Sequence, residues 1–325
     1  MKNAYTVLGL FLAFALVFGS GQSTAQSFPS KPIRIIVGYP PGGTNDLLPR
    51  IVSPQLAERL GQPVVVENKP GADAMIASEY VARASPDGYT LLVGASGQMV
   101  YNPALGARLT YDPLKDFVPI TMFASDPLVF VVNPSVQATN IKELIALAKA
   151  KPGALFYAAG APPFFVAMET FKKVAGVNIV HVPYKGSGAS INAAMAGEVP
   201  MVVVSVGPVL THLRSGKLRA LAVTSDNRDP VLPEIPTVRE SGLDFEGGMW
   251  SALYAPAGTP SAVIDRLYGE LSAILKSESM KKQFATLGYD TGAMGMSPAE
   301  LGTFHRAQLE KWTRVVKEYD IRVAK

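Results

Sequence analysis

Short apolar runs rich in valine, isoleucine and leucine alternate with longer segments of helical periodicity along most of the chain. The first part contains three such runs, separated by two helical segments: PIRIIVGY, QPVVVEN and YTLLVG. Alternation of strands and helices at this spacing predicts βαβ units and a parallel sheet. The runs are almost continuously apolar, which is typical of strands that are covered on both faces.

A second series of strands and helices begins at PLVFVVNPS and ends at LRALAVTS. Two extended passages, near Phe123–Val129 and Gly247–Tyr254, connect it with the first series, to which the helical segment 260–325 also belongs. We therefore predict an α/β protein of two lobes, of which lobe 1 is discontinuous (residues 26–126 and 249–325) and lobe 2 is continuous (residues 127–248). A cleft between two such lobes is a common place for a ligand.

Residues 1–25 have the form of a secretory signal peptide. Lys2 precedes an apolar run from Val7 to Phe18, and the small residues Ser23 and Ala25 stand before a cleavage point near Ala25. The run is shorter than the roughly 20 apolar residues that a membrane span requires. The sequence thus predicts export to the periplasm, with an uncleaved N-terminal anchor as the alternative.

Composition excludes several classes of protein. The net charge is +4, and the sequence contains no cluster of five or more Lys or Arg residues. We therefore predict no surface for binding nucleic acid. Because the chain has no Cys, it has no disulfide, thiol nucleophile, thiolate metal site or lipid-modified N-terminal Cys. Its three His residues are far apart and form no metal-binding pair. We expect no metal and no cofactor.

Five loops that follow predicted strands share a composition of Gly, Ala, Ser, Thr and Pro: YPPGGTND, GASGQMVYNP, AAGAPPFF, PYKGSGAS and VSVGPV. Glycine lets the backbone approach a ligand closely, and a helix N-terminus adds unpaired N–H donors with partial positive charge. Several such ends around one cleft form a site for an anion, either carboxylate or phosphate. Ser187 and Gly188 are candidate ligand contacts in this site, with a plain helix start as the alternative reading.

The same loops match no nucleotide or hydrolase motif. GxxxxGK[ST] and GxGxxG are absent from the first strand end, and Gln98 stands where GxSxG requires glycine. Ser279 and Lys282 match SxxK, but on a charged helix where a chance match is favoured. We therefore expect no catalytic residue and no enzyme activity. Asp46 is expected to cap a helix, since a carboxylate would repel an anionic ligand.

Several long motifs in order along the chain resemble the periplasmic receptors of tripartite tricarboxylate transporters, the TctC or Bug family. They include PIRIIVGYPPGGTNDLLPR, ASPDGYTLLVG, NPALGARLTYDPLKDFVPIT, HVPYKGSG, SGKLRALAVTS and APAGTP. The resemblance implies a two-lobed type II periplasmic binding fold that closes over a small carboxylate. In this family, backbone amides and small hydroxyls from both lobes hold one carboxylate. Those positions correspond to Tyr39, Gly42, Gly43, Thr44, Ser96, Gly160, Ser187 and Ser205.

The sequence departs from the family pattern in the loops that face the cleft. Asp73–Met75 stands where the family has glycines after NKPGA, Pro162–Phe165 where it has Gly-Ser and a His, and Val203–Ser205 where it has Phe-Asp-Ser. We therefore expect a more apolar site and a ligand with one carboxylate and an apolar or aromatic body. Phe164 is expected to line this site as part of an aromatic wall with Phe165, the alternative being that either ring packs in the core.

Pro49 is a further departure, because the family has Ala before Arg50 at this position. A helix that starts at Asn45 would lose a hydrogen bond at Pro49. The sequence leaves open a helix that begins only at Pro49, with residues 43–48 as an extended lip of the cleft.

The function that we expect is an extracytoplasmic receptor that binds a small organic carboxylate and delivers it to the membrane subunits of a tripartite tricarboxylate-type transporter. One alternative is a receptor that presents its liganded form to a sensor kinase without transport, and another is a secreted hydrolase. We expect a monomer.

Overall fold

The computed structural model describes residues 28–322, so the predicted signal peptide lies outside the described residues. The described residues from Lys31 onward belong to one compact unit. Its strands are β1 (Ile33–Val37), β2 (Val64–Asn68), β3 (Thr90–Ala95), β4 (Phe117–Val132), β5 (Phe156–Ala159), β6 (Val180–Pro183), β7 (Met201–Ser205), β8 (Arg219–Val223) and β9 (Gly248–Pro256).

The α-helices of the described residues are α2 (Thr44–Leu60), α3 (Met75–Ala82), α4 (Asn102–Ala104), α5 (Ile141–Ala150), α6 (Pro162–Ala175), α7 (Ser187–Ala196), α8 (Val206–Arg214), α9 (Ser261–Leu275), α10 (Glu278–Thr286) and α11 (Pro298–Glu318). Short helical turns lie at η1 (Ala72–Ala74), η2 (Gly97–Tyr101) and η3 (Arg239–Ser241). Within residues 28–322, no helix combines the length and the apolar character that a membrane crossing needs.

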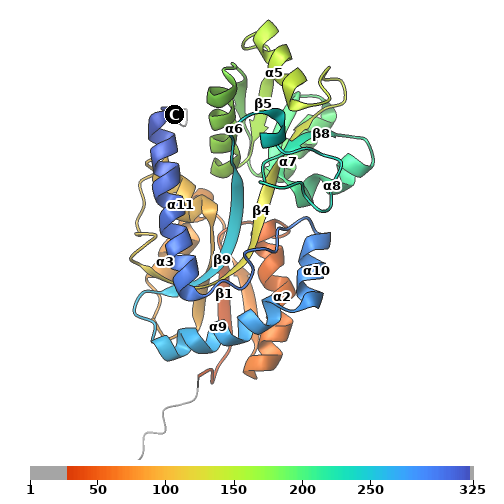
Figure 1. Ribbon diagram of the computed structural model, residues 1–325. Coiled ribbons are helices and arrows are strands. Elements are labelled where there is room, and N and C mark those ends of the chain that lie inside the picture. Colours follow the sequence, from red (N-terminus) through yellow and green to blue (C-terminus); the bar gives the residue numbers. More distant parts are fainter. Residues whose placement is uncertain (1–27, 323–325) are drawn as a thin grey trace, which may run out of the picture. The chain divides into compact units, whose positions relative to one another are not determined.

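The strands form one mixed sheet in the order β2-β1-β3-β9-β4-β7-β5-β6, with β8 also paired to β4 (Figure 1). In one half, β1 pairs in parallel with β2 and β3. In the other half, β5 pairs in parallel with β6 and β7. The predicted βαβ units are therefore present in both halves, and the antiparallel strands β4 and β9 lie between them.

Strand β4 belongs to both halves of the sheet. Its first part pairs antiparallel with β9 as far as Pro127, and its last part, from Leu128, pairs antiparallel with β7 and β8. At this change of partner the Leu128 N–H donates to the Thr224 hydroxyl at 2.9 Å, and the Thr224 N–H donates to the Leu128 carbonyl at 2.9 Å. A side chain thus completes the backbone pairing where one strand partner replaces another.

The directions of the strands bring the loops of both halves to one place. Strands β1, β2 and β3 run parallel to β4, because β9 is antiparallel to both β3 and β4. The C-terminal ends of β1, β2 and β3 therefore point toward the position in β4 where its pairing partner changes. Strands β5, β6 and β7 run antiparallel to β4, from the other side, so they also end there. The loops after these six strands consequently meet at the junction of the two halves.

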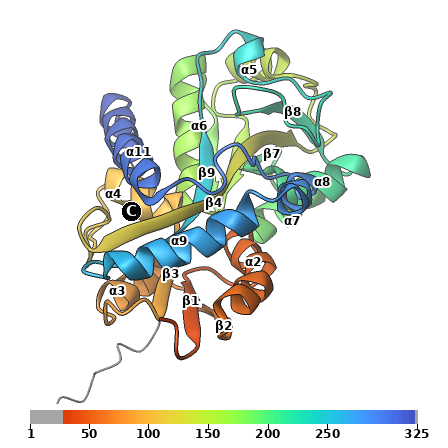
Figure 2. The same ribbon diagram turned by 60° about the horizontal axis from the view of Figure 1, so that its bottom comes forward.

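Both faces of the second half are covered by helices, as the apolar runs predicted (Figures 1 and 2). Phe130 and Val203 belong to one buried cluster, which also contains Phe171 of α6. Their neighbours Val131 and Val204 belong to another cluster, with residues of α7 and α8. Because successive side chains of a strand point to opposite faces, β4 and β7 contribute to two hydrophobic layers.

Helix α2 runs without a break through Pro49 and Pro54, so the extended lip over residues 43–48 is wrong. A proline inside a helix costs about 3 kcal/mol, because it removes a hydrogen bond. Against this cost, Leu48, Val52, Leu56 and Leu60 form a stripe at every fourth position and are each at most 7% exposed. Burial of such side chains stabilises by about 1.5–3 kcal/mol each, which outweighs the two prolines.

Two glycine substitutions test the packing of this sheet. In Gly94→Ala, the added methyl group would lie 2.5 Å from the ring of Tyr254, which is 1% exposed. We expect a loss of about 1–3 kcal/mol in unfolding free energy, since neither group has room to move. In the control Gly269→Ala, in α9, the methyl group meets nothing within 4 Å. This variant should gain about 0.5–1 kcal/mol. Urea unfolding measures both values, and equal stability of the two variants would contradict the packing.

Candidate ligand-binding site

The four helices that follow the predicted ligand loops begin without a side-chain cap. They are α2, α6, α7 and α8, preceded by Gly43, Ala161, Gly186 and Ser205. Helices α5, α10 and α11 follow none of these loops and are capped by Asn140, Ser277 and Ser297, whereas α3, α4 and α9 also begin without a side-chain cap. An uncapped helix start leaves backbone N–H groups for another acceptor. Helix α6 offers fewer of these donors, because its first two residues are Pro162 and Pro163.

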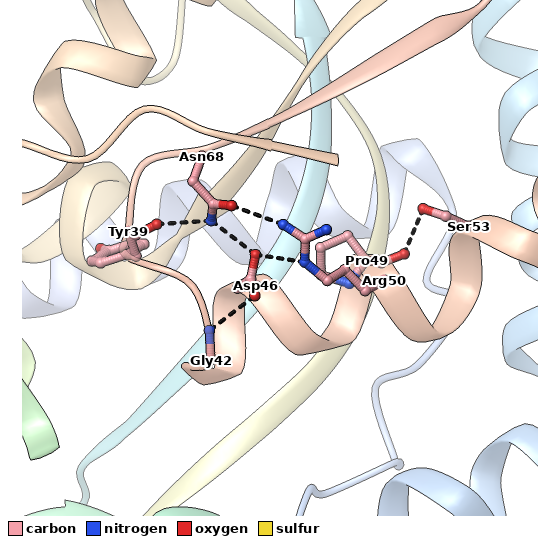
Figure 3. A network of polar contacts seen from close by, with 7 residues as sticks. All are labelled: Tyr39, Gly42, Asp46, Pro49, Arg50, Ser53 and Asn68. Atoms are coloured by element: carbon pink, nitrogen blue, oxygen red, sulfur yellow. Dashed lines mark hydrogen bonds and ion pairs between the residues drawn. The ribbon is translucent and has the colours of Figure 1, made fainter. Parts of the chain in front are cut away.

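The first loop is held in place by the carboxylate of Asp46, which is buried in the first turn of α2 (Figure 3). The carboxylate accepts the Gly42 N–H at 2.9 Å, the Asn68 amide at 2.8 Å and Arg50 Nε at 2.9 Å. The Asn68 amide also donates to the Tyr39 carbonyl at 3.0 Å, which ties the end of β2 to the loop after β1. These bonds fix the backbone of the loop and make Asp46 an acidic residue of the first turn of α2, rather than a cap of the helix, which has no side-chain cap.

The phenol of Tyr39 occupies the junction of the two halves. Its hydroxyl donates to Gln98 Oε1 at 2.9 Å, and burial raises the pKa of this phenol far above its usual value. A side chain at Gly97 would come within 2.6 Å of the Tyr39 hydroxyl and 4.0 Å of Pro163 in α6. The loops after β1, β3 and β5 therefore meet here, and Gly97 leaves the room for them.

Gly160 is required by the approach of two loops in the second half. A Cβ at this position would lie 2.3 Å from the Gly186 carbonyl, and the Gly186 N–H donates to the Gly160 carbonyl at 3.0 Å. Gly186 has φ +84°, a conformation that glycine adopts without strain. This contact sets the start of α7, where the predicted ligand residues Ser187 and Gly188 lie.

Thr44 and Ser205 come from different halves and meet at one carboxyl group, that of Asp126. The Thr44 hydroxyl donates to Asp126 Oδ2 at 3.2 Å, and the nearby Ser205 hydroxyl lowers the pKa of the same carboxyl group. Asp126 is 2% exposed and stands next to the position where β4 changes partner. The sequence interpretation passed over Asp126, although it is a single carboxylate within the apolar run FASDPLVFVV.

The other predicted residues lie in different surroundings. Ser96 is 1% exposed, and its hydroxyl is buried without a hydrogen-bond partner. Gly42, Gly43 and Gly188 are exposed. Phe164 is 2% exposed and packs within the hydrophobic core, whereas Phe165 packs against the ring of His181 at 4.9 Å.

Backbone strain marks the turn after β2. Ala72, Asp73 and Ala74 have φ values of +47°, +49° and +70°, in the left-handed region. Each such residue costs about 1–2 kcal/mol unless it is glycine. Asp73 and Ala74 are two of the positions at which the sequence departs from the glycines of the family pattern, and glycine would adopt these φ values without strain. The Asn102 amide, which donates to the Asp73 carbonyl at 3.1 Å, helps to hold this turn.

A cavity of about 440 Å³ lies beside the junction and is unsuited to an anion. Its walls include five carboxylates: Asp126, Asp226, Asp229, Glu246 and Asp290. The cation among its lining residues, Arg228, is engaged by Glu240 at 2.6 Å. None of the predicted ligand residues lines this cavity, so charge and position both favour the uncapped loops as the site for an anion.

No group of three or more potential metal ligands is present among residues 28–322. Some of the predicted residues thus lie in three contacting sets, around Tyr39, around Gly160 and around Asp126, and the others lie outside them. The contacts within these sets are made between protein groups. Ligand binding at the ten positions remains a prediction.

Comparison with known proteins identifies the class. The family model of the tripartite tricarboxylate transporter family receptor, TctC, matches residues 48–321. The chain therefore belongs to the TctC family, as its motifs indicated. It has the two-lobed fold of periplasmic binding proteins of this family, which confirms the predicted fold.

Individual relatives cover almost the whole chain. Protein BugT of Bordetella pertussis is 34% identical over 98% of this chain and 98% of its own length. The structure of Rpa4515 of R. palustris with adipate has a TM-score of 0.85 at 32% identity, covering 91% of this chain and 99% of that one. The structure of MatC from Rhodopseudomonas palustris with bound malate has a TM-score of 0.81 at 29% identity, covering 89% of this chain and all of that one.

The charge on Asp46 should stabilise the loop in a pH-dependent manner. Burial disfavours the charged form, but hydrogen bonds from Gly42, Asn68 and Arg50 outweigh it and lower the pKa of Asp46. We expect Asp46→Asn to cost about 2 kcal/mol at pH 7, since the neutral amide turns an N–H group toward these donors. A lowered pKa adds stability above the unfolded value of about 3.9, and that stability is lost as pH falls through the folded value.

Urea unfolding of the native protein and Asp46→Asn between pH 3 and 7 measures this difference. The difference in unfolding free energy between the two proteins should be largest near pH 7 and should decrease below about pH 4. A constant gap over the whole range would show that the charge of Asp46 does not stabilise the loop.

Proposed function

We propose that this protein is an extracytoplasmic solute receptor that binds a small organic carboxylate at the junction of its two lobes. The lobes in this proposal are residues 26–126 with 249–325, and residues 127–248. The exchange of β4 between strand partners next to Asp126 supports this division. Its ligand residues are Tyr39, Gly42, Gly43, Thr44, Ser96, Gly160, Phe164, Ser187, Gly188 and Ser205.

One combination of features carries the proposal: α2, α7 and α8 start at the junction without side-chain caps, and the buried hydroxyl of Ser96, directly after β3, has no hydrogen-bond partner among residues 28–322. Unpaired N–H groups and a helix dipole attract an anion. A buried polar atom without a partner implies a further partner such as ligand or water. Together they form a set of neutral donors, which suits a carboxylate without requiring Lys or Arg.

The relatives support the class of ligand. Adipate and malate, which the two R. palustris proteins hold, are small organic carboxylates. In this chain Phe164 lies in the core, so an aromatic wall at the site would require this ring to turn toward the ligand. The proposed ligand has an apolar or aromatic body, because prolines and phenylalanines occupy the start of α6.

The family also supports a role in uptake. In this proposal the receptor carries the carboxylate to the membrane subunits of a tripartite tricarboxylate-type transporter from the periplasm, after cleavage of the signal peptide near Ala25. It acts without catalysis and as a monomer.

Two substitutions of Gly43 test the site with little effect on the fold. A Cβ added at Gly43 would meet nothing within 4 Å, and the residue precedes the uncapped start of α2. Asp and Asn are both favourable at the start of a helix, so both variants should fold. Gly43→Asp adds a negative charge where the carboxylate is proposed to bind, and should weaken binding by about tenfold or more. Gly43→Asn has the same size without the charge, and should bind more tightly than Gly43→Asp.

Isothermal titration calorimetry with a panel of aliphatic and aromatic carboxylates gives the affinities of the native protein and both variants. Equal affinities for Gly43→Asp and the native protein would place the carboxylate elsewhere. Failure of every acid in the panel to bind the native protein would argue against the proposed function itself.

A further inference from the structure

The carboxyl group of Asp126 occupies a position that resembles that of a bound anion. It lies next to Thr44, the first residue of α2, and next to Ser205, the residue that precedes α8. These two helices come from opposite halves of the sheet, and neither has a side-chain cap of its own. Negative charge at a helix N-terminus is stabilised by the unpaired N–H groups and the helix dipole.

Asp126 also engages the hydroxyl groups that the sequence assigned to a ligand. A hydroxyl has a single proton to donate, and the Thr44 proton goes to Asp126 Oδ2 at 3.2 Å. The Ser205 hydroxyl lies near the same carboxyl group, whose pKa it lowers. The Thr44 hydroxyl is therefore already used by a carboxyl group that belongs to the protein, and Ser205 of the other half stands beside the same group.

The other oxygen of this carboxyl group, Oδ1, is buried and has no hydrogen-bond partner among the described residues. Burial, with a contribution from the nearby carboxyl of Asp229, raises the pKa of Asp126 to about 7 against the lowering effect of Ser205 and Thr44. Above this pH Asp126 is ionised. A second carboxylate placed beside Oδ1 would then face like charge in a buried environment, or would have to force a proton onto the pair, and either course weakens the binding of a dianion.

We propose that Asp126 determines specificity: its carboxyl takes the position between α2 and α8 where a second carboxylate of the ligand would bind, and so makes the receptor selective for monocarboxylates. The inference rests on the proposed carboxylate-binding function and names its substrate class. The first carboxylate of the ligand uses the donors that Asp126 leaves free, at Ser96 and at the start of α7. The rest of the ligand is uncharged.

The experiment compares two pairs of acids, each matched in shape and differing by one carboxylate: hexanoate with adipate, and benzoate with terephthalate. Calorimetric titration of the native protein at about pH 8, where Asp126 is ionised, should give about tenfold tighter binding of the monocarboxylate in the pair that fits the site. Asp126→Ser removes the carboxyl group and leaves room. It should raise the affinity for the dicarboxylate of that pair about tenfold, with little change for the monocarboxylate.

Two further variants separate charge, shape and folding. Asp126→Asn keeps the shape of the side chain and removes the charge, so it should narrow the preference even where Asp126→Ser unfolds. Asp290→Asn removes an equal charge from the wall of the neighbouring cavity, where no contact with Thr44 or Ser205 exists among the described residues. It should leave the preference unchanged.

The outcomes are distinct. Two results would overturn the specificity role of Asp126 without affecting the proposed function. In one, the native protein binds the dicarboxylate of a pair as tightly as the monocarboxylate. In the other, the preference for the monocarboxylate persists in both Asp126 variants. If the native protein binds none of the four acids, while a wider panel finds no carboxylate ligand, the proposed function fails and the specificity role fails with it.

Discussion

The shared strand β4 is the constraint on which the rest of the structure depends. Because one continuous strand pairs first with β9 and then with β7 and β8, the two halves form a single sheet. The parallel strands of each half must then end at the change of partner, and their Gly-rich loops meet there. Asp126 and Pro127 stand at this point, so the residues that join the halves are also the residues beside the candidate site.

The electrostatics of the junction follow from this geometry. One side holds uncapped helix starts, which favour an anion, and the other side holds a cavity with five carboxylates, which disfavours one. Asp126 lies between the two environments, with hydrogen bonds toward the first and a place on the wall of the second. A chain with a net charge of +4 thus distributes its charges so that neutral donors, rather than Lys or Arg, define the anion site.

The alternation of apolar runs and helical segments was sufficient to predict the parallel units and the exchange between two halves, because these depend on local periodicity. The place of Asp46 in the first turn of α2 also followed from the sequence, whereas the cap that we expected from it is absent. Three features depend on tertiary packing and escaped the sequence. Helix α2 passes through its prolines because a buried stripe of Leu and Val outweighs them. Residues 226–248 contain the buried side chains of Leu232, Val238 and Phe245 despite a polar composition. The importance of Asp126 appears only when Thr44 and Ser205, 161 positions apart in the chain, are seen beside it.

The contrast between capped and uncapped helices has a thermodynamic meaning for the folded chain. Helices α5, α10 and α11 carry a capping side chain in their own sequence. Helices α2, α7 and α8 carry none, so their first N–H groups depend on acceptors from elsewhere in the protein or from outside it. A ligand that accepted from these groups would bind only the folded chain and would shift the unfolding equilibrium by mass action. The folded state would then be more stable with its ligand than without it.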